Sequence, residues 1–295
     1  VISVVGNHQV TALGLTVSAG GLTKVYDATS DMVNLVLSSS ALAGDRISLS
    51  ATAAYADKNV DANKAYVISN IAHAGLDAAN YSLLTTSITG TDGAISARPL
   101  TVTYAGVNKT YDGSSTATVT TTDNRVAGDD FSIARTALFQ TGGSNSKTVE
   151  ANKAIAVTGV SLSGTDAANY ALVATSGATT ASITPKTLTI SGITAADKVY
   201  DASTVATVSV AGVTPAVMQA GGMVAGDVVT ITVPTGTFSD KNVGSGKTVT
   251  FTGVSYGGAD LANYTVVDQT STTATITPAT LTLAVLTTGV TKVYD

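Results

Sequence analysis

The side chains that could do chemistry are few, and most of them recur in two short patterns. A lysine stands two residues before a Tyr-Asp pair in a Lys-x-Tyr-Asp motif, and an Asp-x-Ala-Asn-Tyr motif follows each of the first three. The residues that the two motifs single out are Lys24, Tyr26, Asp27, Asp77, Asn80, Tyr81, Lys109, Tyr111, Asp112, Asp166, Asn169, Tyr170, Lys198, Tyr200, Asp201, Asp260, Asn263 and Tyr264.

Two interpretations of these motifs remain open. In the structural one, which we favour, Asp side chains hold turns and Tyr rings cover the core. In the chemical one, each lysine forms an isopeptide bond with an asparagine. That reaction needs a lysine packed among apolar groups beside a buried carboxylate, which Asp27 or Asp77 could supply. The three pairs are Lys24 with Asn80, Lys109 with Asn169 and Lys198 with Asn263.

Both motifs belong to a tandem repeat. The tyrosines of Lys-x-Tyr-Asp stand 85, 89 and 94 residues apart, at positions 26, 111, 200 and 294. An Ala-Gly-Asp step, a Lys-x-Val step and the Asp-x-Ala-Asn-Tyr motif follow in this order in three copies, and insertions such as 215–223 fall only between these markers. The interval from the lysine of Lys-x-Val to the last tyrosine is always 23 residues: Lys58 to Tyr81, Lys147 to Tyr170 and Lys241 to Tyr264.

Other catalytic chemistry has no group of residues to support it. The absence of cysteine excludes disulfides, thiol catalysis and Cys-containing metal sites. Of two histidines, His8 precedes the first repeat, and His73 stands where the other copies have Leu162 and Tyr256. Neither is expected in a triad or a zinc site. We expect a protein that is not an enzyme.

Calcium is the remaining candidate cofactor. Asp129-Asp130 and the stretch 57–61 offer oxygen ligands. Neither has the dense alternation of Asp and Asn that six or more ligands require, and the second has no counterpart in the middle copy. We expect no cofactor, with Ca²⁺ at the joints between domains as the alternative.

A period near 90 residues predicts separate domains. It is long enough for a small sandwich with its own core, whereas solenoid units repeat every 20–45 residues or so. We place boundaries at the steps Arg98-Pro99, Thr184-Pro185 and Thr277-Pro278, because proline fixes φ where one strand hands over to the next domain. The predicted parts are the end of a preceding segment (1–12), repeat 1 (13–98), repeat 2 (99–185), repeat 3 (186–278) and the first strand of a truncated fourth repeat (279–295).

Alternation of polar and apolar residues predicts six or seven strands in each repeat. In repeat 3 it is clearest at 187–191, 205–210, 248–254 and 273–277. The segment 260–264 resembles the tyrosine corner of immunoglobulin-like sandwiches, so its tyrosine should be buried, with the hydroxyl bonded to backbone of the same repeat. We predict an all-β protein, a tandem array of immunoglobulin-like β-sandwich domains in an elongated rod.

Charge and the distribution of apolar residues exclude two classes of partner. The net charge is −5, 12% of residues are charged, and no segment gathers enough Lys or Arg to neutralise a run of phosphates. No apolar run approaches the roughly 20 residues that span a bilayer. We expect no nucleic-acid partner and no membrane insertion of this segment.

The ordered motifs, from Lys-x-Tyr-Asp to Asp-Lys-Asn-Val-Gly and Gly-Ala-Asp-x-Ala-Asn-Tyr, resemble the YDG and related MBG repeats of bacterial filamentous-haemagglutinin-like surface adhesins. The resemblance covers the chain from about residue 13 onward. It implies a protein secreted by, or attached to the surface of, a diderm bacterium, and a role in cell adhesion, aggregation or biofilm formation.

Two functions remain open within this class. The repeats are a stalk that projects an adhesive region, or they bind extracellular polysaccharide, a host receptor or like molecules on other cells, weakly and multivalently. Sugar-binding faces usually present exposed aromatic rings. The aromatic residues outside the motifs do not recur at matched positions, and they are Tyr55, Tyr66, Tyr104, Tyr256, Phe131, Phe139, Phe238 and Phe251. The sequence therefore favours the stalk.

Overall fold

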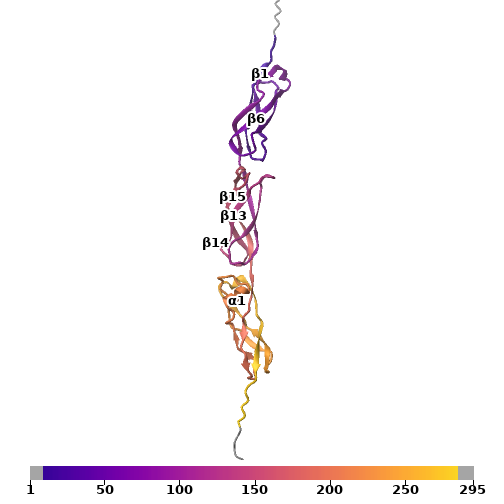
Figure 1. Cartoon of the computed structure of the whole chain (residues 1–295). Helices are drawn as coiled ribbons and strands as arrows, with labels where there is room; N and C mark the ends of the chain where they lie inside the picture. Colours follow the sequence, from indigo (N-terminus) through magenta and orange to yellow (C-terminus); the bar gives the residue numbers. More distant parts are fainter. Residues whose placement is uncertain (1–8, 285–295) are drawn as a thin grey trace, which may run out of the picture. The chain divides into compact units, whose positions relative to one another are not determined.

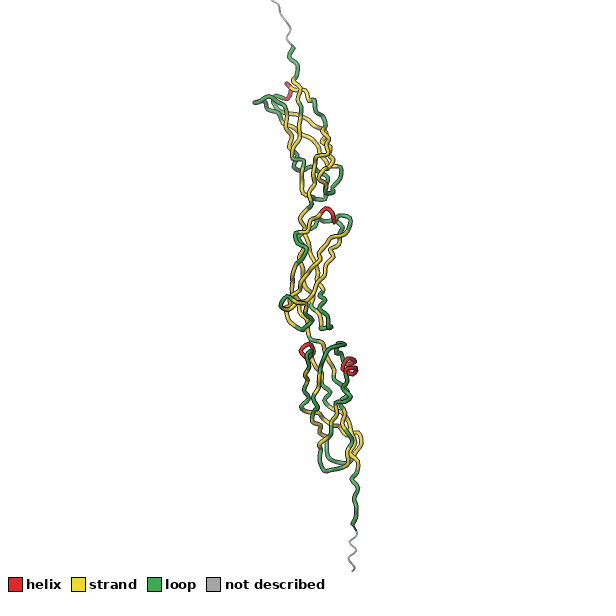
Figure 2. Tube along the Cα trace, turned by 90° about the vertical axis from the view of Figure 1, so that its left-hand side faces the viewer, coloured by secondary structure: helices red, strands yellow, loops and turns green. Residues whose placement is uncertain are grey.

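The computed structural model describes residues 9–284, and it is an all-β protein with one α-helix and three 3₁₀ turns in that part (Figures 1 and 2). Two compact units are formed. Unit 1 comprises the chain up to Ala105 with Val119–Ala137 and Ala156–Thr179. Unit 2 comprises Gly106–Thr118, Leu138–Ile155 and the chain from Thr180 onward. The residues of repeat 2 are therefore divided between the units.

Repeat 1 contains one four-stranded sheet and two strand pairs. The sheet has the order β3-β8-β6-β5, in which β3 is parallel to β8 and the other neighbours are antiparallel. Strand β1 pairs parallel with β7, and β2 pairs antiparallel with β4. The bounds are β1 Leu13–Leu15, β2 Val17–Gly20, β3 Thr23–Val25, β4 Val36–Ser39, β5 Ser48–Tyr55, β6 Asp61–Ala74, η1 Ala78–Asn80, β7 Tyr81–Leu83 and β8 Ile88–Ser96.

The core of unit 1 follows from alternation along the long strands. In β6 every second side chain from Lys64 to Ile68 is buried. Asn70 has a φ of 56°, and after it the buried positions resume at Ile71, so the strand keeps its apolar face on the core. The apolar cluster continues from repeat 1 into Phe131 and Tyr170 of repeat 2. Successive repeats thus share apolar packing within this unit.

Repeats 2 and 3 keep the pairing pattern of repeat 1, with a main sheet of order β11-β17-β15-β13-β14 in repeat 2 and β20-β28-β25-β24-β21 in repeat 3. The parallel pairs recur as β9 with β16 and β18 with β27. Bounds in repeat 2 are β9 Arg98–Leu100, β10 Val102–Val107, β11 Lys109–Thr110, β12 Thr118–Asp123, β13 Ser132–Thr141, β14 Ser144–Asn145, β15 Glu150–Ser163, η2 Ala167–Asn169, β16 Tyr170–Leu172 and β17 Gly177–Thr184. Those in repeat 3 are β18 Lys186–Thr189, β19 Thr194–Ala195, β20 Lys198–Val199, β21 Val205–Ala206, β22 Val208–Ser209, α1 Pro215–Ala220, β23 Thr230–Ile231, β24 Thr235–Phe238, β25 Gly244–Thr252, β26 Tyr256–Gly257, η3 Leu261–Asn263, β27 Tyr264–Val267 and β28 Ser271–Thr277.

Helix α1, in the insertion of repeat 3, is an element that alternation could not reveal. Its N-cap is Thr214, whose hydroxyl accepts the Val217 N–H, and proline occupies the first helical position. Met218 and Met223 are buried and attach the insertion to the repeat. Capping residues and a proline were the available sequence signal.

The predicted first strand of a fourth repeat falls mostly outside the described residues. Residues 278–284 are described and carry no strand, and 285–295 lie beyond the described part. Of the predicted preceding segment 1–12, residues 1–8 likewise lie outside it.

Candidate repeat-to-repeat interface

The last tyrosine of each repeat forms a buried corner with the Ala-Gly-Asp step of the same repeat. In repeat 2 the Tyr170 hydroxyl accepts the Val126 N–H at 2.8 Å and donates to Asp129 Oδ2 at 2.5 Å. In repeat 1 the Tyr81 hydroxyl accepts the Leu42 N–H and donates to Asp45 in the same way. The burial and backbone bond predicted for these tyrosines are present, and the carboxylate partner is an addition that the sequence analysis did not foresee.

A second tyrosine reaches the same carboxylate from the preceding repeat. Tyr26, in the Lys-x-Tyr-Asp motif of repeat 1, is fully buried and donates its hydroxyl to Asp129 Oδ1 at 3.0 Å. Its ring meets that of Tyr170 edge to face, with centroids 5.5 Å apart. Aromatic pairs prefer this geometry. One carboxylate therefore joins two tyrosines from successive repeats within unit 1.

A lysine from the preceding repeat neutralises the buried carboxylate. Lys58 Nζ lies 3.2 Å from Asp129 Oδ1 and 2.8 Å from Asp166 Oδ1, while the side chain of Asp129 is 2% exposed. The ion pair with Asp166 is the main reason why the pKa of Lys58 is raised, and the neighbouring Tyr26 hydroxyl and Asp129 carboxylate add to it. A buried carboxylate left without a cation would be costly, so the lysine of Lys-x-Val is a part of the interface.

An asparagine completes the contact. Asn169 is 2% exposed, and its side-chain Oδ1 accepts the Val60 N–H of repeat 1 at 2.9 Å. Its Nδ2 donates to Asn59. Asp166 meanwhile accepts the Asp130 N–H at 3.0 Å and so fixes the turn that carries the asparagine. The Asp-x-Ala-Asn-Tyr motif thus supplies three groups to one interface.

The same set recurs in unit 2 between repeats 2 and 3. Tyr111 and Tyr264 both donate to Asp227 Oδ2, at 2.8 and 2.6 Å, and Lys147 Nζ lies 2.8 Å from Asp227 Oδ1. Burial by itself would raise the pKa of the Asp227 carboxyl, but the hydrogen bonds from Lys147, Tyr264 and Tyr111 outweigh it, and its pKa lies below the ordinary value. Asn263 accepts the N–H of Val149 at 3.0 Å, and Asp260 lies 3.9 Å from Lys147.

The lysines of Lys-x-Tyr-Asp bond within their own turn and not to an asparagine. Lys24 Nζ donates to Asp27 at 2.7 Å and to the carbonyl and hydroxyl of Thr29. The same contacts join Lys109 to Asp112 and Ser114, and Lys198 to Asp201 and Ser203. Among the described residues, no hydrogen bond connects these lysines with Asn80, Asn169 or Asn263. The structure therefore does not bring the proposed isopeptide partners together.

A second set of paired lysines was missed by the sequence analysis. Lys64, Lys153 and Lys247 stand six residues after the lysine of Lys-x-Val in each copy, and Lys153 is fully buried. They form ion pairs with Asp57, Glu150 and Asp240. Their fixed spacing was the signal that could have revealed them. Their role is to hold the turn that presents the lysine of the interface.

The residue after Tyr-Asp requires a left-handed backbone. Its φ is 66° at Ala28, 79° at Gly113 and 63° at Ala202. Alanine is strained in this region, whereas glycine is not. The strain is tolerated because the carboxylate of the Tyr-Asp pair, as in Asp27, accepts the N–H two residues on and fixes the turn.

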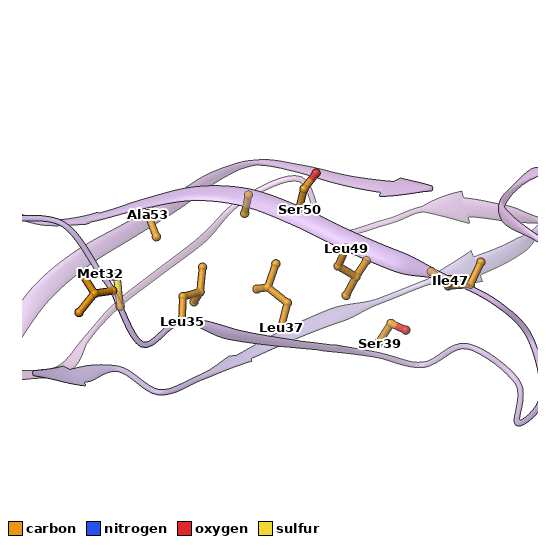
Figure 3. Close-up of a pocket in the computed structure, with 10 residues that line it drawn as sticks. Met32, Leu35, Leu37, Ser39, Ile47, Leu49, Ser50 and Ala53 are labelled. Atoms are coloured by element: carbon orange, nitrogen blue, oxygen red, sulfur yellow. The ribbon is translucent and has the colours of Figure 1, made fainter. Parts of the chain in front are cut away.

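A groove opens at one edge of repeat 1, between the segment that includes β4 and strand β5. Figure 3 shows side chains from both sides pointing into it, among them Met32 and Leu35 from the segment before β4, Leu37 from β4 and Leu49 from β5. Its volume is about 510 Å³, and aliphatic side chains with two serines make up the lining. None of its ten lining residues is aromatic, so the groove has no platform on which a sugar ring could stack.

Two kinds of site are absent from residues 9–284. No three His, Cys, Asp or Glu side chains gather where they could share a metal ion. In that same part of the chain, no helix has the length and apolar character needed to cross a bilayer. At the interfaces, the carboxylates of Asp129 and Asp227 are engaged by lysine and tyrosine donors.

Alkaline pH is expected to destabilise the interfaces. Burial, assisted by the bond to Asp129, raises the pKa of Tyr170 to about 12, against about 10 for an unperturbed tyrosine. Because the folded state holds this proton more firmly than the unfolded state, the stabilisation is complete below pH 10 and is lost between pH 10 and 12. The raised pKa of Lys58 acts in the same direction. Urea unfolding at pH 8–12 should show the decline, and Tyr170→Phe should make it shallower. An unchanged decline in that variant would contradict the assignment.

The fold and its recurring interface define a tandem all-β repeat protein. A family model described as the YDG domain matches residues 11–89, 96–180 and 184–274, which is most of the chain. The chain therefore belongs to the YDG domain family. No curated protein sequence matches it.

Proposed function

We propose that the chain is a structural spacer of a large secreted bacterial surface protein. In this proposal immunoglobulin-like β-sandwich repeats stand end to end in an elongated rod and project an adhesive region for attachment, aggregation or biofilm formation. The observation that supports it most is the recurring interface. A buried carboxylate, two tyrosines, a lysine and an asparagine join successive repeats, such as repeats 1 and 2 around Asp129. A spacer needs such stiff joints, because a flexible joint would shorten its reach.

The corner geometry supports the sandwich part of the proposal. In immunoglobulin-like domains a tyrosine near the end of the fold bonds back to upstream backbone through its hydroxyl. Tyr170 likewise bonds back to upstream backbone, at the Val126 N–H, and Tyr264 does so at the Val224 N–H, but these partners lie 44 and 40 residues upstream and not the few residues of the immunoglobulin corner. Three copies of one corner are what a tandem array of such domains requires.

Location, partners and the lack of enzymatic activity are parts of the same proposal. Membership of the YDG domain family is consistent with a surface protein, and the motifs that recur in every repeat are used for packing. We propose that the repeats act without a cofactor. Weak multivalent binding of polysaccharide or a host receptor is the competing function, and the aliphatic lining of the groove beside Leu37 and Leu49 offers it little support.

Small-angle X-ray scattering from the 295-residue chain tests the spacer. End-to-end repeats with strands of usual length predict a rod on the order of 100–130 Å long for the three repeats. The double variant Asp129→Ala/Asp227→Ala, which loses the shared carboxylate of both interfaces, should scatter as a flexible chain with a broader distance distribution. A compact profile for the unsubstituted chain would refute the spacer and would favour a composite binding site.

A further inference from the structure

Within the described residues, one half of the interface stands assembled on repeat 1 with no other repeat packed against it. We call Asp45, Asp77, Asn80 and Tyr81 the acceptor half. Tyr81 already donates to Asp45 at 2.6 Å, and Asp77 accepts the Arg46 N–H at 2.8 Å. These are the bonds that Tyr170 and Asp166 make in repeat 2. Yet Asp45 and Asn80 are exposed to solvent, whereas their counterparts in repeat 2, Asp129 and Asn169, are buried.

The complementary half, on repeat 3, likewise has no other repeat packed against it in the part of the chain that the structure describes. We call Tyr200, Lys241 and the Val243 N–H the donor half. The Tyr200 N–H donates to the Thr277 carbonyl at 2.8 Å, as the Tyr26 N–H does to Ser96. Asp240 accepts the N–H of Asn242, as Asp57 accepts that of Asn59, so the turn beside Lys241 is in place. Tyr200 is nevertheless 36% exposed, whereas Tyr26 is fully buried.

We propose that each half binds a further repeat of this kind, which presents the opposite half. The occupant of the donor half on repeat 3 presents a carboxylate, an asparagine amide and a tyrosine, as repeat 2 does with Asp129, Asn169 and Tyr170. The occupant of the acceptor half presents a tyrosine, a lysine and a backbone N–H. The binding of further repeats deepens the spacer proposal, and its biological use rests on that proposal. The chemistry by which the two halves recognise each other does not depend on it.

Three matched features point to this occupant. The charges are complementary, with Asp45 and Asp77 on the acceptor half and Lys241 on the donor half. The polar groups of each half already have the internal bonds seen in the two closed interfaces, so little reordering is needed on binding. The apolar part is also matched, because the Tyr200 ring would gain the edge-to-face partner that Tyr111 has in Tyr264.

An extended chain tests the donor half. In this extended chain, Ile276 is followed directly by a second copy of residues 96–184, which contains every strand of repeat 2. The spacing from Ile276 to the leucine of the added copy then equals that from Ile95 to Leu100. Hydrogen–deuterium exchange is then read by mass spectrometry on the peptide around Val243, which occurs once in the extended chain. In the proposal the added Asn169 accepts the Val243 N–H, and its exchange slows by about tenfold or more relative to the 295-residue chain.

The matched controls carry one substitution in the added copy only. Asp129→Ala removes the shared carboxylate, and Asn169→Ala removes the acceptor of the Val243 N–H while leaving the carboxylate and both rings. Both should return the exchange of Val243 to that of the 295-residue chain. The proposal is overturned if the Val243 N–H exchanges at the same rate in the extended and the 295-residue chains. It is also overturned if the extended chain with Asn169→Ala protects this N–H as well as the extended chain without the substitution. Neither result bears on whether scattering from the 295-residue chain shows a rod, so the two proposals fail separately.

Discussion

Replacing Tyr170 by alanine is expected to cost about 3–5 kcal/mol of unfolding free energy, the usual cost of truncating a large buried aromatic side chain. Its ring lies between Phe131, at 4.9 Å, and Tyr26, at 5.5 Å between centroids. Its hydroxyl is the acceptor of the Val126 N–H. Alanine would leave a cavity at the interface. It would also leave the Val126 N–H without its acceptor and Asp129 Oδ2 without its donor. Chemical denaturation of the 295-residue chain, followed by circular dichroism, measures the loss.

Two variants separate the contributions to that loss. Tyr170→Phe keeps the ring and removes the hydroxyl, so it should cost about 1–3 kcal/mol for the polar groups left unsatisfied. Tyr81→Ala truncates the same corner in repeat 1, where no ring from a preceding repeat is packed in the described part of the chain. It should cost less than Tyr170→Ala. An equal or larger cost for Tyr81→Ala would mean that Tyr26 adds nothing to the packing of Tyr170.

The long strands of this protein could be predicted from its sequence, but the number of strands could not. Six or seven were expected in each repeat, and in the described part of the chain repeats 1, 2 and 3 contain eight, nine and eleven. Alternation located the long strands, such as β25 and β28 in repeat 3, because a strand buried on one face repeats every second residue. The burial of Tyr81, Tyr170 and Tyr264 followed from the likeness of their motif to a corner. Short strands such as β19 and β26 were not predicted, because two residues carry no detectable alternation.

The interface was not predicted, because its contacts join residues from different repeats. Tyr26 and Asp129 are 103 residues apart in sequence, and a recurring motif does not tell whether it pairs within its own copy or with the next. The isopeptide hypothesis paired lysine with asparagine inside one repeat for this reason. In the structure Lys24 bonds to Asp27 in its own turn, and Asn169 bonds to the Val60 N–H of the preceding repeat.

Removing the shared carboxylate with Asp129→Ala is expected to destabilise both repeats that meet at it, by about 3–5 kcal/mol in total. The loss leaves the Tyr26 and Tyr170 hydroxyls without an acceptor and Lys58 without one of its two carboxylates. Asp45→Ala is the matched control. Asp45 has the same corner bond to Tyr81 but no tyrosine or lysine from a preceding repeat in the described chain, so its loss should cost clearly less.

A double-mutant cycle with Tyr26→Phe then isolates the part of this energy that passes between repeats. Tyr26→Phe removes only the hydroxyl that reaches Asp129 from repeat 1, and the ring that packs on Tyr170 remains. Residues in one hydrogen-bond network couple by about 0.5–3 kcal/mol, whereas independent sites add within about 0.5 kcal/mol. We expect coupling between Tyr26 and Asp129, and none between Tyr26 and Asp45, from calorimetric unfolding of the four variants of each cycle. Additive costs for Tyr26 and Asp129 would show that the carboxylate stabilises repeat 2 alone, and the mechanical link between repeats would then depend on the rings and on Asn169.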